Sequence, residues 1–402
     1  MKTLNTKTDI KALADILRQG GLVAVPTETV YGLAGNALDE NAVRRIYAVK
    51  GRPEVKPLSV MVPDESAFAR WCVAVPRAAH SLAARFWPGP LTIVLRAGDA
   101  VPEITRAGGR TLGLRCPDHP LTFALLRETG LPLAAPSANP SGAPSPKTAD
   151  EVLAWFDGQI DAVLDGGRCG IGRESTIIDL SAPPYRILRR GALAEGEIYD
   201  ALRESLTVVG ITGGSGCGKT TALNVLREKG ALILDCDEIY HALTVSSDPL
   251  REELTARFGQ VYDGRILDRK ALGAVVFSDP DALSDLNAIT HKYVADELTR
   301  LLTEHALNGG TLAAIDAIGL LDIENGRQTA FNVAVTAPEE DRIERLMRRE
   351  GISRDYALQR IRAQKPNEYF AARCDYVLEN AGTLAEFENQ CKEFFTEVLK
   401  HV

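Results

Sequence analysis

The stretch GITGGSGCGKTT (210–221) decides the fold of the second half of the chain. It contains Gly213-x4-Gly218-Lys219-Thr220, which matches the P-loop pattern GxxxxGK[ST]. The β-branched run TVVGIT (207–212) before it predicts a strand, and TALNVLREKG after it predicts a helix that ends at Gly230. Glycines allow backbone N–H groups to turn toward phosphate oxygens, and the start of a helix adds partial positive charge. The sequence therefore predicts a nucleotide-binding loop that opens a domain in the middle of the chain.

Each residue type in this loop has an expected role. Lys219 would neutralise charge on the β- and γ-phosphates, and the Thr220 hydroxyl would ligate Mg²⁺. The residues expected to bind ATP here are Gly213, Gly214, Ser215, Gly216, Cys217, Gly218, Lys219, Thr220 and Thr221.

A pair of acidic residues follows the helix after the loop. The segment ALILDCDEI (231–239) reads as a strand that ends at Asp235 and Asp237. A carboxylate at the carboxyl end of a strand beside a phosphate site can deprotonate an acceptor hydroxyl. The alternative is that an aspartate caps the following helix. The sequence lacks an NKxD tetrapeptide, which weakens a GTPase interpretation.

The bulk properties describe a soluble globular protein of 402 residues, long enough for two domains. No apolar run approaches the length of a membrane span, and the N-terminus lacks the features of a secretory signal. The seven cysteines include no CxxC pair, which argues against a disulfide framework or a zinc ribbon. We therefore expect a cytoplasmic protein. The net charge is about +1 for residues 1–206 and about −9 for the remainder, so strong nucleic-acid binding is not expected.

Both halves alternate short apolar strands with amphipathic helices, which predicts α/β architecture. In the first half a helix is expected from Asp9 to Gln19, ended by glycines. Strands are expected at 21–25, 91–96, 111–115, 131–135, 161–165 and 175–180. The Pro- and Ser-rich segment 136–148 is expected to be a loop. These patterns place a first domain at 1–195, a short helical linker at 196–206 and a second domain at 207–402.

Three polar clusters in the first half indicate an anion site without a P-loop. They are VPTETVYGLAG (25–35), VKGRPEVKPLSVMV (49–62) and APSANPSG (135–142). The second cluster brings Lys50, Arg52 and Lys56 into one turn-forming stretch, and the third places Ser137 and Asn139 after an apolar strand. Such groups suit a polyanionic ligand with an adenine or amino-acid partner. Solvated turns are the alternative interpretation.

The second half resembles the dephospho-coenzyme A kinases. The resemblance covers almost all of 207–402 and includes TGGSGCGKT, LDCDEI, LNAITH and VAVTAPEEDRIERLMRREGISRDYALQRIRAQ. It implies a P-loop kinase fold with a parallel sheet, a helical lid and an acceptor-binding region. It also implies that Asp237 is the base acting on the ribose 3′-hydroxyl of dephospho-coenzyme A, with ATP as the phosphoryl donor.

The same resemblance assigns further residues. Arg269 and His291 would bind the coenzyme, Arg345 and Arg349 would belong to the lid over ATP, and Gln364 would lie near the adenine side. The alternatives are a solvated helix face for the two lid arginines and a cap or surface role for His291. The sequence departs from the family at Lys292 and in DAIGLLDIE (316–324), where many members carry proline. Both departures concern the acceptor side.

Residues 10–193 resemble the YrdC-type threonylcarbamoyl-AMP synthases. The signature KxR…SxN is present as Lys50, Arg52, Ser137 and Asn139, together with PTETVYGL, WPGPLT, GLRCPDHP, GRESTIIDL and ILRRGAL. The resemblance implies a twisted mixed sheet with a concave site. It also implies that L-threonine, bicarbonate and ATP form threonylcarbamoyl-AMP and pyrophosphate, an intermediate for a tRNA modification, with Mg²⁺ accompanying ATP.

Carried over by position, the resemblance implies two sets of binding residues. The threonine site would comprise Thr29, Met61, Arg115, Ala135 and Ser175. ATP would be bound by Arg52, Lys56, Thr111, Ser137, Asn139, Ser145 and Arg189, with Lys50 also holding the triphosphate. Lys50 and Arg52 would stabilise the charge that develops on pyrophosphate. The sequence departs from many relatives at Lys56, Met61, Arg168 and Arg190.

We therefore expect a bifunctional enzyme that uses ATP in both domains. The alternative is an RNA-binding module joined to a P-loop kinase of another small alcohol. Contact with tRNA threonylcarbamoyl transferase proteins is expected to be transient, and no membrane association is expected.

Overall fold

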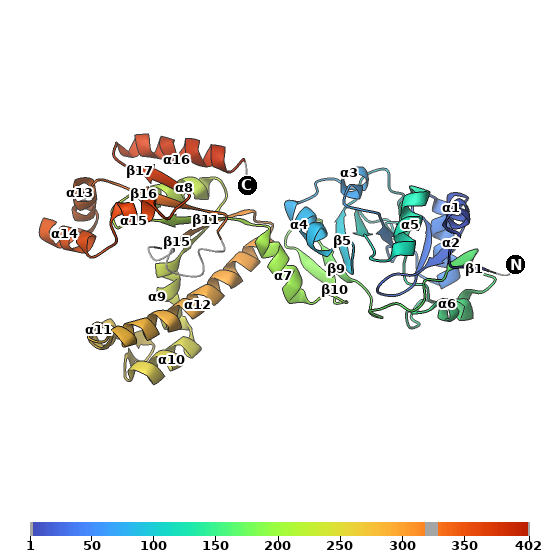
Figure 1. The fold of residues 1–402 in the computed structure, drawn as a ribbon, viewed down its shortest axis with the longest axis horizontal. Coiled ribbons are helices and arrows are strands. Elements are labelled where there is room, and N and C mark those ends of the chain that lie inside the picture. The colour runs from blue at the N-terminus through green and yellow to red at the C-terminus, as the bar shows by residue number, and fades with distance from the viewer. Residues whose placement is uncertain (1–2, 318–328, 401–402) are drawn as a thin grey trace. The chain divides into compact units, whose positions relative to one another are not determined.

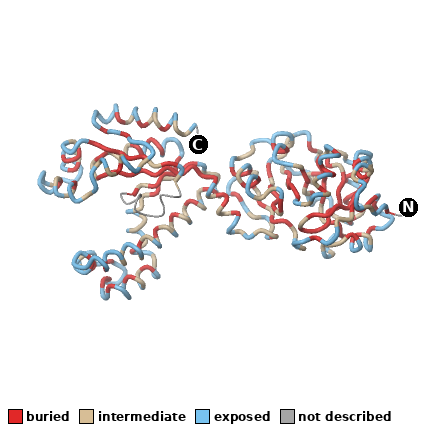
Figure 2. Tube along the Cα trace, viewed as in Figure 1, coloured by how far each residue is buried: buried red, intermediate tan, exposed pale blue. Residues whose placement is uncertain are grey.

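The computed structural model describes residues 3–317 and 329–400, which form two compact units. One unit comprises Met1–Ser205 with Leu307–Gly309, and the other comprises Leu206–Ala306 with Gly310–Val402. Figure 1 traces both units, and Figure 2 shows that the buried residues follow the strands of each sheet. The expected linker segment 196–206 consists mostly of helix α7 (Glu195–Glu204), which contacts helix α4 (Arg77–Phe86) of the first unit.

The first unit is built on a ten-stranded mixed sheet with the order β1-β8-β2-β3-β7-β4-β6-β5-β9-β10. Its strands are β1 (Leu4–Thr6), β2 (Val23–Val25), β3 (Gly32–Asn36), β4 (Ser59–Met61), β5 (Leu91–Arg96), β6 (Thr111–Arg115), β7 (Leu133–Ala134), β8 (Ala162–Leu164), β9 (Thr176–Asp179) and β10 (Arg186–Arg189). Its other helices are α1 (Ile10–Arg18), α2 (Glu40–Lys50), α3 (Ala67–Trp71), α5 (Pro120–Thr129) and α6 (Ala149–Phe156).

The local sequence explains these elements. Asp9 caps α1 by accepting a hydrogen bond from the amide of Ala12, and Gly20 follows the helix with a φ of +82°. Helices α1 and α5 contact each other, and their leucines join a core with β2, β7 and β8. The prediction of a mixed sheet is confirmed, and strands β5 and β6 have the predicted bounds.

The second unit contains a five-stranded sheet with the order β12-β15-β11-β16-β17, in which every pair is parallel. The strands are β11 (Thr207–Thr212), β12 (Leu232–Asp235), β15 (Leu312–Asp316), β16 (Phe331–Thr336) and β17 (Tyr376–Glu379), with a separate hairpin of β13 (Tyr262–Asp263) and β14 (Ile266–Leu267). The predicted parallel sheet is confirmed. The central strand β11 is buried along its whole length, which explains its β-branched, apolar sequence.

The helices of this unit fall into three groups with separate cores. Helices α8 (Lys219–Glu228) and α16 (Leu384–Val398) pack together over the sheet, and α15 (Asn367–Ala371) contacts β16. A second core joins α10 (Asp248–Phe258), α11 (Arg269–Val276) and α12 (Pro280–Leu307), to which α9 (Cys236–Ser246) leads from β12. A third core lies between α13 (Glu339–Glu350) and α14 (Arg354–Arg362). Figure 1 shows the α10–α12 group projecting from the sheet.

Candidate nucleotide-binding sites

The loop between β11 and α8 wraps closely around neighbouring side chains. Gly213, Gly216 and Gly218 all have positive φ values, of +140°, +80° and +106°. A Cβ atom on Gly214 would lie 2.2 Å from the Arg342 guanidinium, and one on Gly218 would lie 2.3 Å from Asn380 Nδ2. Glycine is therefore required here both for backbone conformation and for space.

Three side chains from later in the chain hold this loop. Arg342 Nε donates to the Ser215 carbonyl (2.9 Å), and Asn380 Nδ2 donates to the Cys217 carbonyl (3.0 Å). Gln364 accepts from the Ser215 amide (2.8 Å) and donates to its hydroxyl (2.7 Å). Arg342 and Asn380 were not predicted from the sequence, because their contacts to the loop depend on the folded positions of α13 and the segment after β17. Gln364 was expected near adenine, and the structure places it against the loop.

A pocket of about 610 Å³ opens beside the loop. Its lining includes the predicted residues Gly214, Ser215, Gly216, Gly218, Lys219, Thr220, Asp237, Arg345, Arg349 and Gln364. It also includes Asp235, Asp316 and Arg360, to which the sequence analysis gave no binding role. The structure thus brings together a phosphate-binding loop, a group of carboxylates and several arginines.

The two aspartates at the end of β12 have different tasks. Asp235 caps α9 by accepting hydrogen bonds from the amides of Asp237 (2.8 Å) and Glu238 (3.1 Å). The Asp237 side chain is exposed and forms no hydrogen bond or ion pair with any residue in the described parts of the chain. The capping role therefore belongs to Asp235, and Asp237 is available for chemistry.

Asp316 ends strand β15, beside Asp235 in the sheet register, and lies 3.9 Å from Lys219 Nζ. Burial raises the pKa of this carboxyl to about 6, although the charge of Lys219 acts in the opposite direction. Lys219 also donates to the Gly213 carbonyl (3.1 Å), which keeps its ammonium at the centre of the loop. The ionised Asp316 is thus an energetic cost of the folded protein near neutral pH.

We expect Asp316→Asn to stabilise the second unit at pH 8. Because the folded pKa lies above the usual value of 3.8, the folded state loses stability as the pH rises through 6. An amide removes this loss, so the free energy of unfolding should rise by about 1–3 kcal/mol at pH 8 and by much less at pH 4. Urea unfolding at the two pH values measures the difference. An equal change at both would contradict the role assigned to burial of the charge.

Arginines from α13 and α14 line the pocket. Arg345 contacts the Gly216 carbonyl (3.4 Å) and Asn380 Oδ1 (3.1 Å), so it is not merely a solvated helix residue. Arg349 and Arg360 also line the pocket, and both pair with Glu350. A further pocket of about 690 Å³, lined in part by Gly218, Arg345, Arg348, Asn380 and Leu384, adjoins this side of the loop.

Neither Arg269 nor His291 lines these pockets. Arg269, at the start of α11, lies 3.1 Å from His241 Nδ1, and His291 is half-buried in α12. Burial lowers the pKa of His291. Both belong to the projecting α10–α12 group. Most of the segment 316–324, where the sequence departs from the family pattern, lies outside the described residues.

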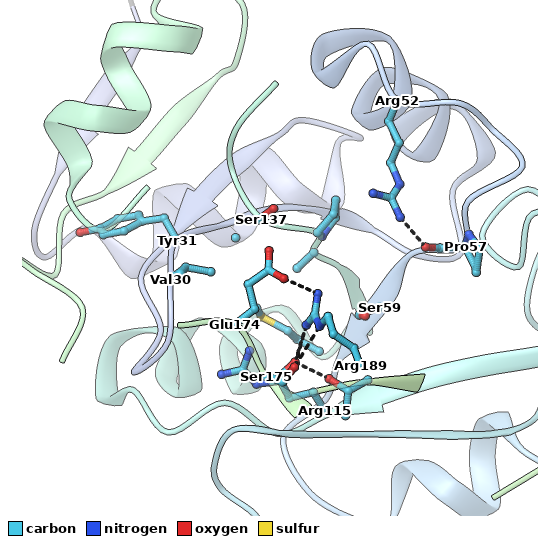
Figure 3. Close-up of a pocket in the computed structure, with 15 residues that line it drawn as sticks. Val30, Tyr31, Arg52, Pro57, Ser59, Arg115, Ser137, Glu174, Ser175 and Arg189 are labelled. Atoms are coloured by element: carbon cyan, nitrogen blue, oxygen red, sulfur yellow. Dashed lines mark hydrogen bonds and ion pairs between the residues drawn. The ribbon is translucent and has the colours of Figure 1, made fainter. Parts of the chain in front are cut away.

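The first unit has its own polar pocket, with a cavity of about 120 Å³ (Figure 3). Seven of the predicted residues line it: Arg52, Met61, Arg115, Ala135, Ser137, Ser175 and Arg189. The walls come from the loop before β3, the loop after α2, and strands β4, β5, β6 and β10, so residues far apart in sequence converge at strand ends. Three guanidinium groups around a small cavity make it suited to anions.

Arg115 is fixed by a buried network. Its Nη2 donates to Glu28 Oε1 (2.7 Å) and to the Thr29 hydroxyl (2.8 Å), and its Nε donates to the Gly89 carbonyl (3.2 Å). The Thr29 hydroxyl therefore helps to fix the Arg115 guanidinium. Glu28 was not predicted as a site residue, although it lies within the quoted PTETVYGL block.

Arg189 is held mainly by two neighbouring residues. Its Nη1 pairs with Glu174 (2.6 Å), and its Nε and Nη2 donate to the Ser175 carbonyl (3.0 and 2.9 Å). Ser145, a predicted ATP contact, donates to the other oxygen of Glu174 (2.9 Å). Glu174 was also missed in the sequence, because an acidic residue is not an obvious component of an anion pocket.

Lys50 lies behind the pocket and is 3% exposed. Its ammonium donates to the carbonyls of Ser137 and Asn139, which joins the two parts of the KxR…SxN signature. Burial, with the nearby charge of Arg52, lowers the pKa of Lys50 to about 8. Arg52 donates to the Pro57 carbonyl (3.0 Å) and shapes the loop before β4.

Besides Lys50 and Ser145, three more predicted ATP contacts do not line the cavity. Lys56 is exposed and contributes its carbonyl oxygen to Arg52 and Tyr47, and Thr111 lies at the start of β6. Asn139 is buried and donates to the Ala143 carbonyl (2.6 Å), and its Oδ1 has no hydrogen-bond partner among the described residues. No helix within residues 3–317 and 329–400 has the length and apolar character needed to span a membrane.

Comparison with known proteins also divides the chain into two parts, at residues 192–206. The family model described as "Telomere recombination" (Sua5/YciO/YrdC) matches residues 15–191, and the dephospho-CoA kinase family model matches 207–386. A threonylcarbamoyl-AMP synthase of Pyrococcus abyssi is 46% identical over 195 residues, which cover 48% of this chain and 57% of that protein. The chain thus spans little more than half the length of this relative.

Two shorter relatives are matched almost completely. A threonylcarbamoyl-AMP synthase of Halorhodospira halophila is 36% identical over 181 residues, covering 45% of this chain and 94% of the relative. A dephospho-CoA kinase of Geobacter sulfurreducens is 33% identical over 195 residues, covering 48% of this chain and 98% of the relative.

Proposed function

We propose two ATP-dependent activities for this chain, which belongs through its first half to the threonylcarbamoyl-AMP synthase family and through its second half to the dephospho-CoA kinase family. The first unit would form threonylcarbamoyl-AMP and pyrophosphate from L-threonine, bicarbonate and ATP. The second would transfer the γ-phosphoryl group of ATP to the ribose 3′-hydroxyl of dephospho-CoA.

The convergence of three arginines on one small cavity supports the synthase activity. Arg115 offers its remaining N–H groups to the carboxylate of threonine, because Glu28, Thr29 and Gly89 already fix its other donors. The threonyl carbamate attacks the α-phosphorus, and the bond to pyrophosphate breaks. Arg52 and Arg189, which line the cavity, supply positive charge where the negative charge of pyrophosphate develops, and the buried Lys50 adds its charge without lining the cavity.

The position of Asp237 beside the phosphate-binding loop supports the kinase activity. Its carboxylate takes the proton of the 3′-hydroxyl as that oxygen attacks the γ-phosphorus, and ADP leaves. Lys219 and the lid residues Arg345 and Arg349 neutralise the transferring phosphoryl group. The pocket of about 690 Å³ beside the loop has room for the base of the nucleotide.

The oxygen donors of the pocket of about 610 Å³ beside the phosphate-binding loop fit Mg²⁺. The Thr220 hydroxyl and the Asp316 carboxylate line the same cavity, and hydroxyl and carboxylate oxygens suit this hard cation. Among the described residues, no three His, Cys, Asp or Glu side chains could hold a metal on their own, so the ion would be shared with the nucleotide phosphates. When bound, it neutralises charge on the β- and γ-phosphates.

Asp237→Asn should lower the rate of dephospho-CoA-dependent ADP formation by about 10²–10⁴-fold, because the variant cannot accept the hydroxyl proton. Affinity for ATP should stay nearly constant. Steady-state kinetics together with ATP binding separate the two quantities. Glu238→Gln, a change at the exposed neighbouring carboxylate, serves as the control and should keep the activity.

The assay of the intact chain with both substrate sets tests the whole proposal. Pyrophosphate release should require threonine and bicarbonate, and ADP formation should require dephospho-CoA. Equal phosphorylation of simple nucleosides would contradict the acceptor assignment, and pyrophosphate release without threonine would contradict the synthase.

A further inference from the structure

We infer that Glu174 accepts the ammonium proton of the amino acid that the first unit activates. This inference rests on the proposed synthase activity and adds a residue to its mechanism. It follows from the charges in the cavity, from the present partners of Glu174 and from the chemistry that the reaction requires.

The cavity is rich in cations and has a single acidic side chain. Arg52, Arg115 and Arg189 line it, and Glu174 alone carries a carboxylate among the described residues that line it. Glu28, which does not line the cavity, accepts from Arg115 Nη2 (2.7 Å) and from the Asp118 amide (3.1 Å), so it is committed to fixing Arg115. A cationic group of a ligand therefore finds its counter-charge at Glu174.

The Glu174 side chain lines the cavity, and the Arg189 guanidinium lies between it and Ser175 (Figure 3). One oxygen pairs with Arg189 Nη1 (2.6 Å) and the other accepts the Ser145 hydroxyl (2.9 Å). The side chain is 37% exposed, so these partners are exchangeable rather than part of a closed core. Its neighbour Ser175, one of the predicted threonine contacts, lines the same cavity, so an amino acid bound there would lie within reach of Glu174.

The chemistry requires a proton acceptor at this place. An amino acid in neutral solution carries an ammonium group, which has no lone pair for attack on carbon dioxide. In the inferred step an N–H bond breaks, its electron pair stays on nitrogen, and an O–H bond forms on Glu174. The neutral amine then attacks carbon dioxide, and the second N–H proton lost on carbamate formation balances the proton that bicarbonate consumes when it releases carbon dioxide and water.

Nucleotide binding would prepare Glu174 for this step. The groups that face its carboxylate are Arg189 on β10 and the Ser145 hydroxyl, with the charges of Arg52 and Lys50 nearby. Arg189 and Ser145 are also predicted ATP contacts, so the triphosphate competes for them. A carboxylate that loses its counter-ion and gains a phosphate neighbour accepts a proton more readily.

The test compares Glu174→Gln with wild type across pH. At pH 7 the variant should release threonine-dependent pyrophosphate about 10²-fold more slowly, because the amide cannot take the proton. The deficit should shrink steadily as the pH rises toward 9, since solvent then supplies the free amine. The variant also loses a charge that raises the pKa of Lys50, and an earlier loss of the Lys50 proton would enlarge the deficit as the pH rises, which is the opposite direction. Glu174→Asp, which keeps the carboxylate, should retain more activity than the amide.

ATP binding and a matched control complete the experiment. Affinity for ATP should not fall in Glu174→Gln, which also shows that the variant is folded. Glu195→Gln removes the partner of the exposed Arg190, outside the cavity, and should leave the activity unchanged.

Two outcomes would overturn the inference: a deficit that is the same at every pH, or a tenfold loss of ATP affinity. A wild-type chain without threonine-dependent pyrophosphate release would instead contradict the synthase activity itself.

Discussion

Lys219→Ala should reduce dephospho-CoA-dependent ADP formation by about 10³-fold or more while leaving threonine-dependent pyrophosphate release intact. The lysine ammonium lies at the centre of the phosphate-binding loop, bonded to the Gly213 carbonyl and close to Asp316. Its removal eliminates the positive charge that faces the transferring phosphoryl group. It also leaves Asp316 without its nearby cation, which further weakens binding of the triphosphate.

Lys229→Ala is the matched control for this variant. Lys229 follows the same helix, at its far end, and its ammonium contacts the Thr396 hydroxyl (2.7 Å). The control should retain kinase activity. Parallel assays of ADP formation and pyrophosphate release on each variant test whether Lys219 serves only the kinase activity. Loss of pyrophosphate release in Lys219→Ala would show that the loop serves the first unit as well.

Arg52→Ala should have the opposite effect, a loss of about 10²–10³-fold in threonine-dependent pyrophosphate release with normal kinase activity. Its guanidinium lines the cavity of the first unit and bonds to the Pro57 carbonyl, so it both supplies charge and shapes one wall. Removing it leaves the developing charge on pyrophosphate less stabilised. Lys50, deeper and bonded to two carbonyls, cannot move forward to replace it.

Arg44→Ala provides the comparison for Arg52→Ala. Arg44 lies on α2, pairs with Glu40 on the surface and is remote from the cavity lining. It should behave as wild type in both assays. If Arg52→Ala kept full pyrophosphate release, the cavity would not be the synthase site.

The sequence predicted the parts of the fold that depend on local patterns. Strands at 91–96, 111–115 and 207–212 have the predicted bounds because each is a short apolar run next to turn residues. Short strands such as β1 and β10, whose residues are partly exposed, lack such a pattern. Their place in the sheet depends on pairing with β8 and β9, which single-sequence patterns do not reveal.

The sites also show the difference between what a local sequence pattern predicts and what depends on contacts between distant parts of the chain. The P-loop and the KxR…SxN signature are recognisable as motifs in the sequence. Most residues of the P-loop line the pocket beside it, whereas only Arg52 and Ser137 of the KxR…SxN signature line the cavity of the first unit. Glu174, Arg342 and Asn380 escaped prediction because their importance comes from distant partners. Lys56 was assigned by position within a motif, yet its side chain is exposed and does not line the cavity.

The support of the phosphate-binding loop has a consequence for synthesis of the protein. Ser215 is bonded to side chains 127 and 149 residues further along the chain, and Cys217 to one 163 residues further. On the ribosome, the loop emerges long before Arg342, Gln364 and Asn380 exist. A nascent chain that already carries the complete GxxxxGK[ST] sequence thus still lacks the braces that shape it. The braces of the loop are therefore complete only after the segment that follows β17 has been translated.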